Sequence, residues 1–331
     1  MRYRPLAIGA AAVMGIAIIA IVTIPFFLLP RFDSPLVASP ADFGIDFETV
    51  RLSVDDSTIS LAAWWMPAEA PRAIALLLHD GGSNRSFVWT EGLQLARALT
   101  QHGFHVLAPD LRGHGDSERG SEGPPVGGNL APDISAWIDF ALARAGRLPI
   151  VVHGFGLGGQ VAIYAGAADP RIAAVVADST WADLRTSMQV SILRATALPR
   201  AALPILLWSA EHIHGVDFDQ SRAVDVADVL GDRLLLIQNE GDPQIPLRQL
   251  RWLESVARGS EVWITPAPLP DHPIYVLRGS WGTHTQSYIL DPTAYTQRLM
   301  RFFEERITRA ARRSGFIPRR NSHASLVRLR L

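Results

Sequence analysis

The stretch of sequence that decides the fold is Ile150-Val151-Val152-His153-Gly154-Phe155-Gly156-Leu157-Gly158-Gly159. It begins with three branched apolar residues, passes through a cluster of glycines, and continues into a longer apolar pattern from Leu157. Runs of this kind predict a buried strand, a tight turn and a helix.

The glycine turn itself admits two interpretations. Gly154, Gly156 and Gly159 fit the G-x-G-x-x-G dinucleotide fingerprint, and Asp178 follows where a ribose-binding acid is expected. That fingerprint belongs on the first strand-helix turn of its sheet, whereas at least four expected strands precede this one. The second interpretation is a G-x-S-x-G turn, which lifts its middle residue above the sheet. Gly156 stands in the middle, and small residues at 154 and 158 permit the close backbone approach that this turn needs.

Short apolar runs alternate with longer helical patterns on both sides of this turn. The short runs are rich in Val, Ile and Leu, which is typical of parallel strands buried on both faces. The alternation predicts an α/β fold with a mainly parallel sheet and helices on both faces. The expected strands are 47–54, 58–65, 73–78, 105–108, 150–152, 172–177, 234–237 and 261–265, with a turn at Asp55-Asp56-Ser57; the expected helices are 92–101, 134–145, 157–167, 247–256 and 292–307.

The rest of the chain divides around this pattern. Residues 43–307 form the expected domain, and the irregular, helix-like stretch 181–231 is expected to form a cap over the carboxyl edge of the sheet. Residues 308–331 are basic and contain glycine and proline, so we expect a disordered tail there.

The N-terminus carries an uncharged apolar run from residue 6 to residue 29. About 24 residues of helix span about 36 Å, enough to cross a hydrocarbon core of about 30 Å. We therefore expect residues 1–30 to be a single transmembrane anchor in the lipid bilayer, followed by a tether at 31–42. A cleaved signal peptide is the alternative, although its apolar region is usually shorter. Two arginines precede the span and one follows it, which favours an extracytoplasmic domain.

Four further motifs occur in a fixed order along the chain. They are His79-Asp80-Gly81-Gly82, then Asp110-Leu111-Arg112-Gly113-His114-Gly115-Asp116-Ser117, then Glu240-Gly241-Asp242-Pro243-Gln244-Ile245-Pro246, and last His284 ahead of a helix that opens at Asp291-Pro292. With the glycine turn, they resemble the α/β-hydrolase superfamily of serine hydrolases, esterases and lysophospholipases. The resemblance extends from about residue 43 to residue 303 and implies the α/β-hydrolase fold, with its acid and histidine after the nucleophile turn.

The resemblance also implies the site residues. Gly156 occupies the nucleophile position, Asp242 and His284 are the acid and base, and the oxyanion hole is formed by the N–H of Leu157 with that of Gly81 or Gly82. His272 is a rival for the base, but the residues around 284 match the family better. A serine hydrolase attacks with its serine hydroxyl. Glycine has no such group, so the nucleophile position is vacant.

Other positions depart from the family pattern as well. Asp80 stands where the family has glycine, and its carboxylate would oppose a developing oxyanion if it pointed inward. Phe155 stands where the family often has histidine, and Gln238-Asn239 replaces the usual His-Gly. Two rescues of catalysis stay open: a displaced hydroxyl from Ser83, Ser86, Ser179 or Thr180, and water activated by the Asp242 and His284 pair.

The amino-acid composition argues against several classes of function. The chain of 331 residues has no cysteine and a formal net charge of -1, so thiolate chemistry is excluded and bulk attraction to nucleic acid is not expected. No histidine and carboxylate spacing fits a metal site, and we expect no cofactor. The leading hypothesis is a membrane-anchored, non-catalytic protein that binds a small apolar ligand or a partner. The alternatives are an active hydrolase of ester, lipid or peptide-like bonds and, more weakly, a nucleotide-binding oxidoreductase.

Overall fold

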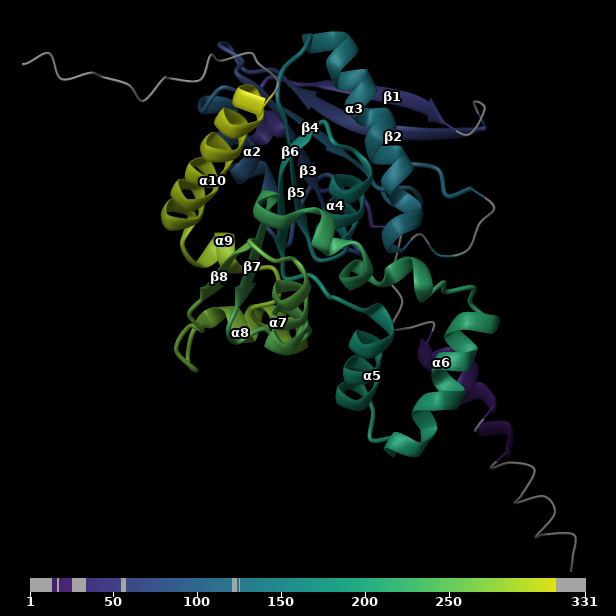
Figure 1. Ribbon diagram of the computed structural model, residues 1–331. Helices are drawn as coiled ribbons and strands as arrows, with labels where there is room; N and C mark the ends of the chain where they lie inside the picture. The colour runs from purple at the N-terminus through teal and green to yellow at the C-terminus, as the bar shows by residue number, and fades with distance from the viewer. Residues whose placement is uncertain are drawn as a thin grey trace, which may run out of the picture.

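The computed structural model describes residues 14–16, 18–25, 34–54, 58–120, 124 and 126–313. Eight strands form one sheet in the order β1-β2-β4-β3-β5-β6-β7-β8 (Figure 1). The strand β1 pairs with β2, and β2 with β4, in antiparallel fashion, whereas all later neighbours are parallel. The predicted mainly parallel α/β sheet is therefore confirmed.

The strands fall close to the ranges that the apolar runs predict. They are β1 Glu48–Val54, β2 Ile59–Met66, β3 Ala73–Leu78, β4 Phe104–Pro109, β5 Ile150–Phe155, β6 Ile172–Asp178, β7 Leu234–Asn239 and β8 Glu261–Thr265. The predicted turn at residues 55–57 lies outside the described residues. β5 continues to Phe155, beyond the predicted end, because Gly154 and Phe155 still pair with β6.

Helices cover both faces of the sheet. Alternate residues of β3 point to opposite faces: Ile74 and Leu76 join one apolar core and Ala75 and Leu77 the other. The first core includes side chains of α3 Ala131–Ala145, α4 Leu157–Ala168 and α7 Leu247–Val256; the second includes those of α2 Gly92–Gln101, α9 Ser287–Leu290 and α10 Pro292–Arg313.

The closing helix α10 is longer than predicted. It runs to Arg313, so residues 308–313, which the sequence assigned to a disordered tail, are helical. The stretch has no helix breaker before Gly315, and Arg309 pairs with Asp232 at 2.6 Å, which ties this turn to the domain. The remaining tail, 314–331, lies outside the described residues.

The expected cap lies between β6 and β7. It contains α5 Leu184–Ala195, α6 Leu203–His212 and several short 3-10 turns, and its two helices project from the lower edge of the sheet in Figure 1. It has its own small core, formed by Met188, Ile192, Leu206, Leu207, Ala210, Val216 and Phe218. The connection after β8 adds the helix α8 Pro273–Arg278, which the sequence pattern does not predict.

The N-terminal segment is described only in part. Residues 14–16 and 18–25 are helical, and much of the predicted anchor lies outside the described residues. Within the described ranges, no helix has both the length and the apolar character to cross a membrane. Ile21 and Ile24 pack against the core of the cap, and His214 Nε2 lies 2.8 Å from the carbonyl oxygen of Val22.

Candidate active site

Gly156 forms the sharp turn between β5 and α4. Its φ of 50° and ψ of -111° place it in a region that residues with a Cβ rarely adopt. Its amide donates to the carbonyl of Asp178 at 2.8 Å, which fixes the turn against β6. A Cβ on Gly154 would lie 2.1 Å from the carbonyl of Gly158, and a Cβ on Gly158 would lie 2.5 Å from the carbonyl oxygen of Leu78, so close backbone approach requires both flanking glycines. The turn therefore has the shape of a nucleophile turn without a nucleophile.

The carboxylate of Asp80 occupies the space beside Gly156. A Cβ built on Gly156 would lie 1.8 Å from Asp80 Oδ1. The same oxygen accepts the backbone N–H of Leu157 at 2.9 Å and that of Gly81 at 2.7 Å. These are the two amides that a hydrolase uses to bind an oxyanion, and the Leu157 amide also opens helix α4, whose N-terminus favours negative charge. The oxyanion hole is thus filled by a carboxylate of the chain itself.

His284 lies between two carboxylates. Its Nδ1 is 2.9 Å from Asp242 Oδ2, and its Nε2 is 3.4 Å from Asp80 Oδ2. Asp242 is held in turn by the backbone N–H groups of Gln244 and Ile245, which donate to Oδ1 at 2.8 and 2.9 Å. All three ionisable side chains are largely buried, Asp80 being the most exposed at 14%. The predicted acid and base are therefore brought together, and Asp80 takes the place that a serine hydroxyl would have beside Nε2.

The charges explain the protonation of this trio. Burial lowers the pKa of His284, but the charge and hydrogen bond of Asp242 and those of Asp80 raise it to about 10. Burial raises the pKa of Asp80, yet the His284 contact and the amides of Leu157 and Gly81 bring it below its ordinary value. The raised pKa favours the imidazolium form of His284 near neutral pH, and that form has no free nitrogen to accept a proton as a general base.

The loop that carries Asp80 is clamped by the second motif. His79 Nε2 accepts the N–H of Leu111 at 3.0 Å, and its Nδ1 lies 2.8 Å from the carbonyl of Asp80. Arg85 is 2% exposed and pairs with both Asp110 and Asp116. Asp110 also accepts the backbone N–H of Arg85 at 2.7 Å. The D-x-R-G-H-G-x-S segment thus acts as a structural clamp on the oxyanion loop.

Of the two predicted oxyanion glycines, it is the Gly81 amide that points into the hole. Gly82 has a φ of 70°, and its carbonyl accepts the hydroxyl of Ser34 at 2.9 Å. The rival base His272 lies on the surface at the start of α8, where its Nδ1 accepts the N–H of Ile274 at 3.2 Å. The geometry therefore selects Gly81 and His284.

Three of the four candidate substitute hydroxyls point to other partners, Ser83 being 3.5 Å from the carbonyl of Asn84, whereas the buried hydroxyl of Thr180 has no hydrogen-bond partner among the described residues. Ser86 donates to the carbonyl of Ala38 at 2.9 Å, and Ser179 donates to Asp178 at 2.9 Å. Asp178 is itself buried and accepts the hydroxyl of Tyr295 at 2.9 Å, so it is not placed to hold a ribose. The nucleotide interpretation loses the acid on which it depended.

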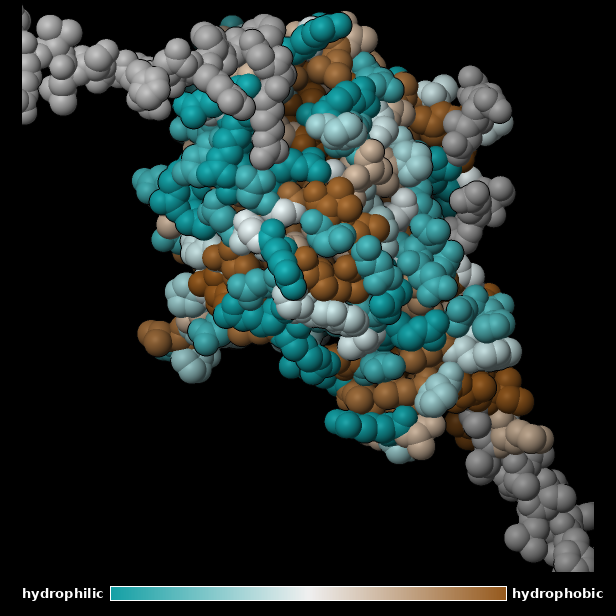
Figure 2. All heavy atoms as spheres, in the orientation of Figure 1, coloured by the Kyte–Doolittle hydropathy of each residue, from teal (hydrophilic) through white to brown (hydrophobic). Residues whose placement is uncertain are grey.

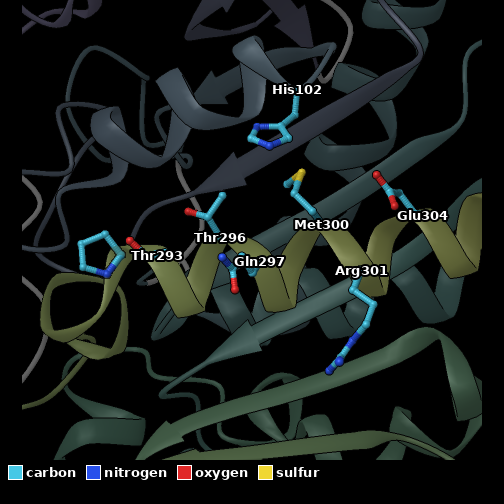
Figure 3. A pocket seen from close by; sticks show the side chains of 8 residues that line it. His102, Thr293, Thr296, Gln297, Met300, Arg301 and Glu304 are labelled. Carbon is cyan, nitrogen blue, oxygen red and sulfur yellow. The ribbon is translucent and has the colours of Figure 1, made fainter.

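Two surface hollows lie away from this trio. One, of about 660 Å³, runs along α10 and is lined by His102 from the end of α2 and by residues from Pro292 to Glu304 (Figure 3). The other, of about 510 Å³, follows β8 and is lined in part by Thr265, His272 and Ser287. Neither hollow is lined by Asp80, Asp242 or His284.

The role of Asp80 is the feature that sequence reasoning missed. Its departure from glycine was visible, and so was the harm of an inward carboxylate. What the sequence lacked was the direction of the side chain, which depends on a vacancy at residue 156, about 76 positions later in the chain. The signal available in the sequence was an acidic residue at position 80 together with a glycine at position 156, because the glycine leaves room for an inward carboxylate.

Comparison with known proteins agrees with the fold. A family model described as the alpha/beta hydrolase fold matches residues 74–251, more than half of the chain. Among solved structures, the esterase Pf2001 of Pyrococcus furiosus has a TM-score of 0.64, with 21% identity over 84% of this chain and 99% of its own. A membrane phospholipase A has a TM-score of 0.56, with 17% identity over 92% of this chain and 99% of its own. At these identities the structures show the fold alone.

Curated relatives match shorter segments. Human protein ABHD12B is 35% identical over 27% of this chain and 23% of its own length. Phospholipase YtpA of Bacillus subtilis is 26% identical over 48% of this chain and 58% of its own, and the lysophosphatidylserine lipase ABHD12 of Macaca fascicularis is 30% identical over 30% and 27%. The chain thus matches less than two thirds of the length of each of these relatives.

Proposed function

Because this chain belongs to the α/β-hydrolase fold family, we propose that it is a non-catalytic member: a membrane-tethered protein that binds an apolar ligand and does not hydrolyse it. In this proposal the apolar run at residues 6–29 is the membrane tether, and the ligand would bind at the carboxyl edge of the sheet, on the side where the cap follows β6. The activities of the relatives suggest the ligand class, since lipases and phospholipases accept acyl chains.

One observation carries this proposal: Asp80 Oδ1 accepts the N–H groups of Leu157 and Gly81 while Gly156 offers no hydroxyl. An ester substrate would have to place its carbonyl oxygen where a carboxylate already is. Two negative oxygens cannot share one pair of donors, so the tetrahedral intermediate of acyl transfer has no stabilising site. The imidazolium of His284 completes an ion pair with that carboxylate.

The test is turnover of a short-chain nitrophenyl ester by a set of variants. The native chain is expected to show no turnover above buffer. Gly156→Ser alone is also expected to be silent, because a Cβ at 156 overlaps Asp80 Oδ1. The double variant Gly156→Ser, Asp80→Ala frees the amides and supplies the hydroxyl, and it is expected to hydrolyse the ester and to react with a fluorophosphonate probe.

Asp80→Asn in the Gly156→Ser background is the matched control. It removes the charge but keeps the size, so it is expected to stay silent if the hole is sterically filled. His284→Ala in the active double variant should abolish turnover. Turnover by the native chain that disappears in His284→Ala would instead support the alternative, an active hydrolase of ester, lipid or peptide-like bonds through activated water.

Ligand binding needs a separate measurement. A lysophospholipid with a fluorescent acyl chain is the probe, and saturable binding without release of fatty acid is the expected result. His284→Ala should leave that binding largely intact, since the proposed contacts are apolar. Absence of saturable binding would contradict the ligand part of the proposal and leave the catalytic part unaffected.

A further inference from the structure

The outer face of the cap carries large apolar side chains that the described chain leaves partly exposed. Ile205, Trp208 and Ile213 are between 42% and 47% exposed. Ile205 and Trp208 are three residues apart on α6, so they share one side of the helix, and Ile213 follows directly after its end. The opposite side of α6 supplies Leu206, Leu207 and Ala210 to the core of the cap. Both sides of this helix are therefore apolar, although it is a surface element.

This face is continuous with the N-terminal segment. Ile21 and Ile24 pack on the core of the cap, while Met14, Ile16, Ile18, Ile19 and Val22 are between 36% and 68% exposed. Figure 1 shows the N-terminal helical residues beside α6, and Figure 2 shows hydrophobic side chains gathered over both at the lower right. A segment packed in this way holds the cap close to any surface into which it inserts.

The charge at the connection between α5 and α6 supports the same partner. Residues 184–210 contain three arginines and no acidic residue, whereas the six acidic residues of the stretch 181–231 are Asp183 and five that lie between 211 and 228. Arg185 pairs with Glu211 at 3.1 Å, which leaves Arg194 and Arg200 as the basic residues at this end of the cap. Arg194 and Arg200 are exposed and flank the connection between α5 and α6. Arginines beside exposed Trp and Ile are the combination that binds an anionic lipid surface, where the ring lies at the level of the headgroups.

From these three observations we infer that the cap is a membrane-binding surface, which lies on an anionic bilayer with Ile205, Trp208 and Ile213 inserted among the headgroups. The inference rests on the proposed tether and adds to it a second contact made by the domain itself. The cap follows directly on the carboxyl end of β6, so this contact would bring the proposed ligand site to the source of its acyl chains.

The absence of cysteine in the sequence makes a direct test possible. A single cysteine at Trp208 or at Ile213 is labelled with an environment-sensitive NBD probe in the 331-residue chain. Gln101→Cys, at the exposed end of α2, is the control. The chains are added to vesicles of phosphatidylcholine, with or without phosphatidylglycerol, that carry brominated acyl chains as a quencher, and flotation reports tethering separately.

The expected result is a blue shift and quenching of the probe at 208 and 213, larger with phosphatidylglycerol, and neither effect at 101. Arg194→Gln with Arg200→Gln should reduce the signal in phosphatidylglycerol vesicles to that in phosphatidylcholine alone. Flotation without quenching at 208 and 213 overturns the cap contact and leaves the tether standing. Failure to float overturns both, and a blue shift without bromine quenching overturns the inference in favour of contact with a second copy of this chain.

Discussion

Gly156→Ala is the most direct perturbation of the closed site, because it adds one carbon where Asp80 already lies. The added Cβ would be 1.8 Å from Asp80 Oδ1, so the carboxylate must leave. It then loses the hydrogen bonds from Leu157 and Gly81 and its contact with His284. We therefore expect Gly156→Ala to lower the free energy of unfolding as well as to change the chemistry of the site.

The magnitude follows from two separate costs. A residue with a Cβ at φ 50° and ψ -111° is strained by about 1–3 kcal/mol. Displacing the carboxylate adds about 1.5–3 kcal/mol for each hydrogen bond to the charged group, less what water restores. We expect Gly156→Ala to cost about 4–6 kcal/mol in the native chain and about 1–3 kcal/mol in an Asp80→Ala background, where only the backbone strain remains.

The assay is a double-mutant cycle on the unfolding free energy. Urea unfolding of the native chain, the two single variants and the double variant is followed by circular dichroism in a mild non-ionic detergent. The expected coupling between residues 156 and 80 is about 3 kcal/mol, well above the about 0.5 kcal/mol found for independent sites. Additive costs would refute the reasoning, since they would mean that the carboxylate does not fill the space above Gly156.

Three further results are expected. The pKa of His284 is raised from 6.5 to about 10, so its charged form contributes stability that is full below pH 6.5 and is lost as pH rises through 10. Over that interval the unfolding free energy of the native chain should fall by up to about 5 kcal/mol, and that of His284→Asn by much less. Urea unfolding at each pH measures both. Burial raises the pKa of Asp178 from 3.8 to about 7, so the stability that comes with its proton is full below pH 3.8 and is lost as pH rises through 7. At pH 9, Asp178→Asn should be more stable than the native chain by roughly 2–4 kcal/mol. An unfolding free energy no higher than that of the native chain would contradict the raised pKa. Arg85→Met leaves the buried Asp110 without its charged partner and should cost about 3–5 kcal/mol, whereas Arg72→Met at an exposed pair should cost under about 1 kcal/mol. Equal costs in thermal unfolding would argue against the clamp.

The local parts of the fold follow closely from local patterns. The strand, turn and helix at residues 150–168 could be predicted because the apolar run, the glycines and the helical period all lie within about 20 residues of one another. α8 and the last turns of α10 were missed because short helices and helix ends depend on tertiary contacts, such as that of Arg309 with Asp232.

By itself, the sequence determined the mainly parallel sheet, because its apolar runs and helical patterns alternate along the chain. The missing serine and the pairing of Asp242 with His284 followed from the resemblance of its motifs to those of α/β-hydrolases. Only the tertiary structure decided that Asp80 turns into the oxyanion hole and that the N-terminal segment lies on the cap. Those contacts join residues far apart in the chain, Asp80 with Leu157 and Val22 with His214. A side chain's direction is set by the space and the donors around it, and both exist only once the strands and helices have packed.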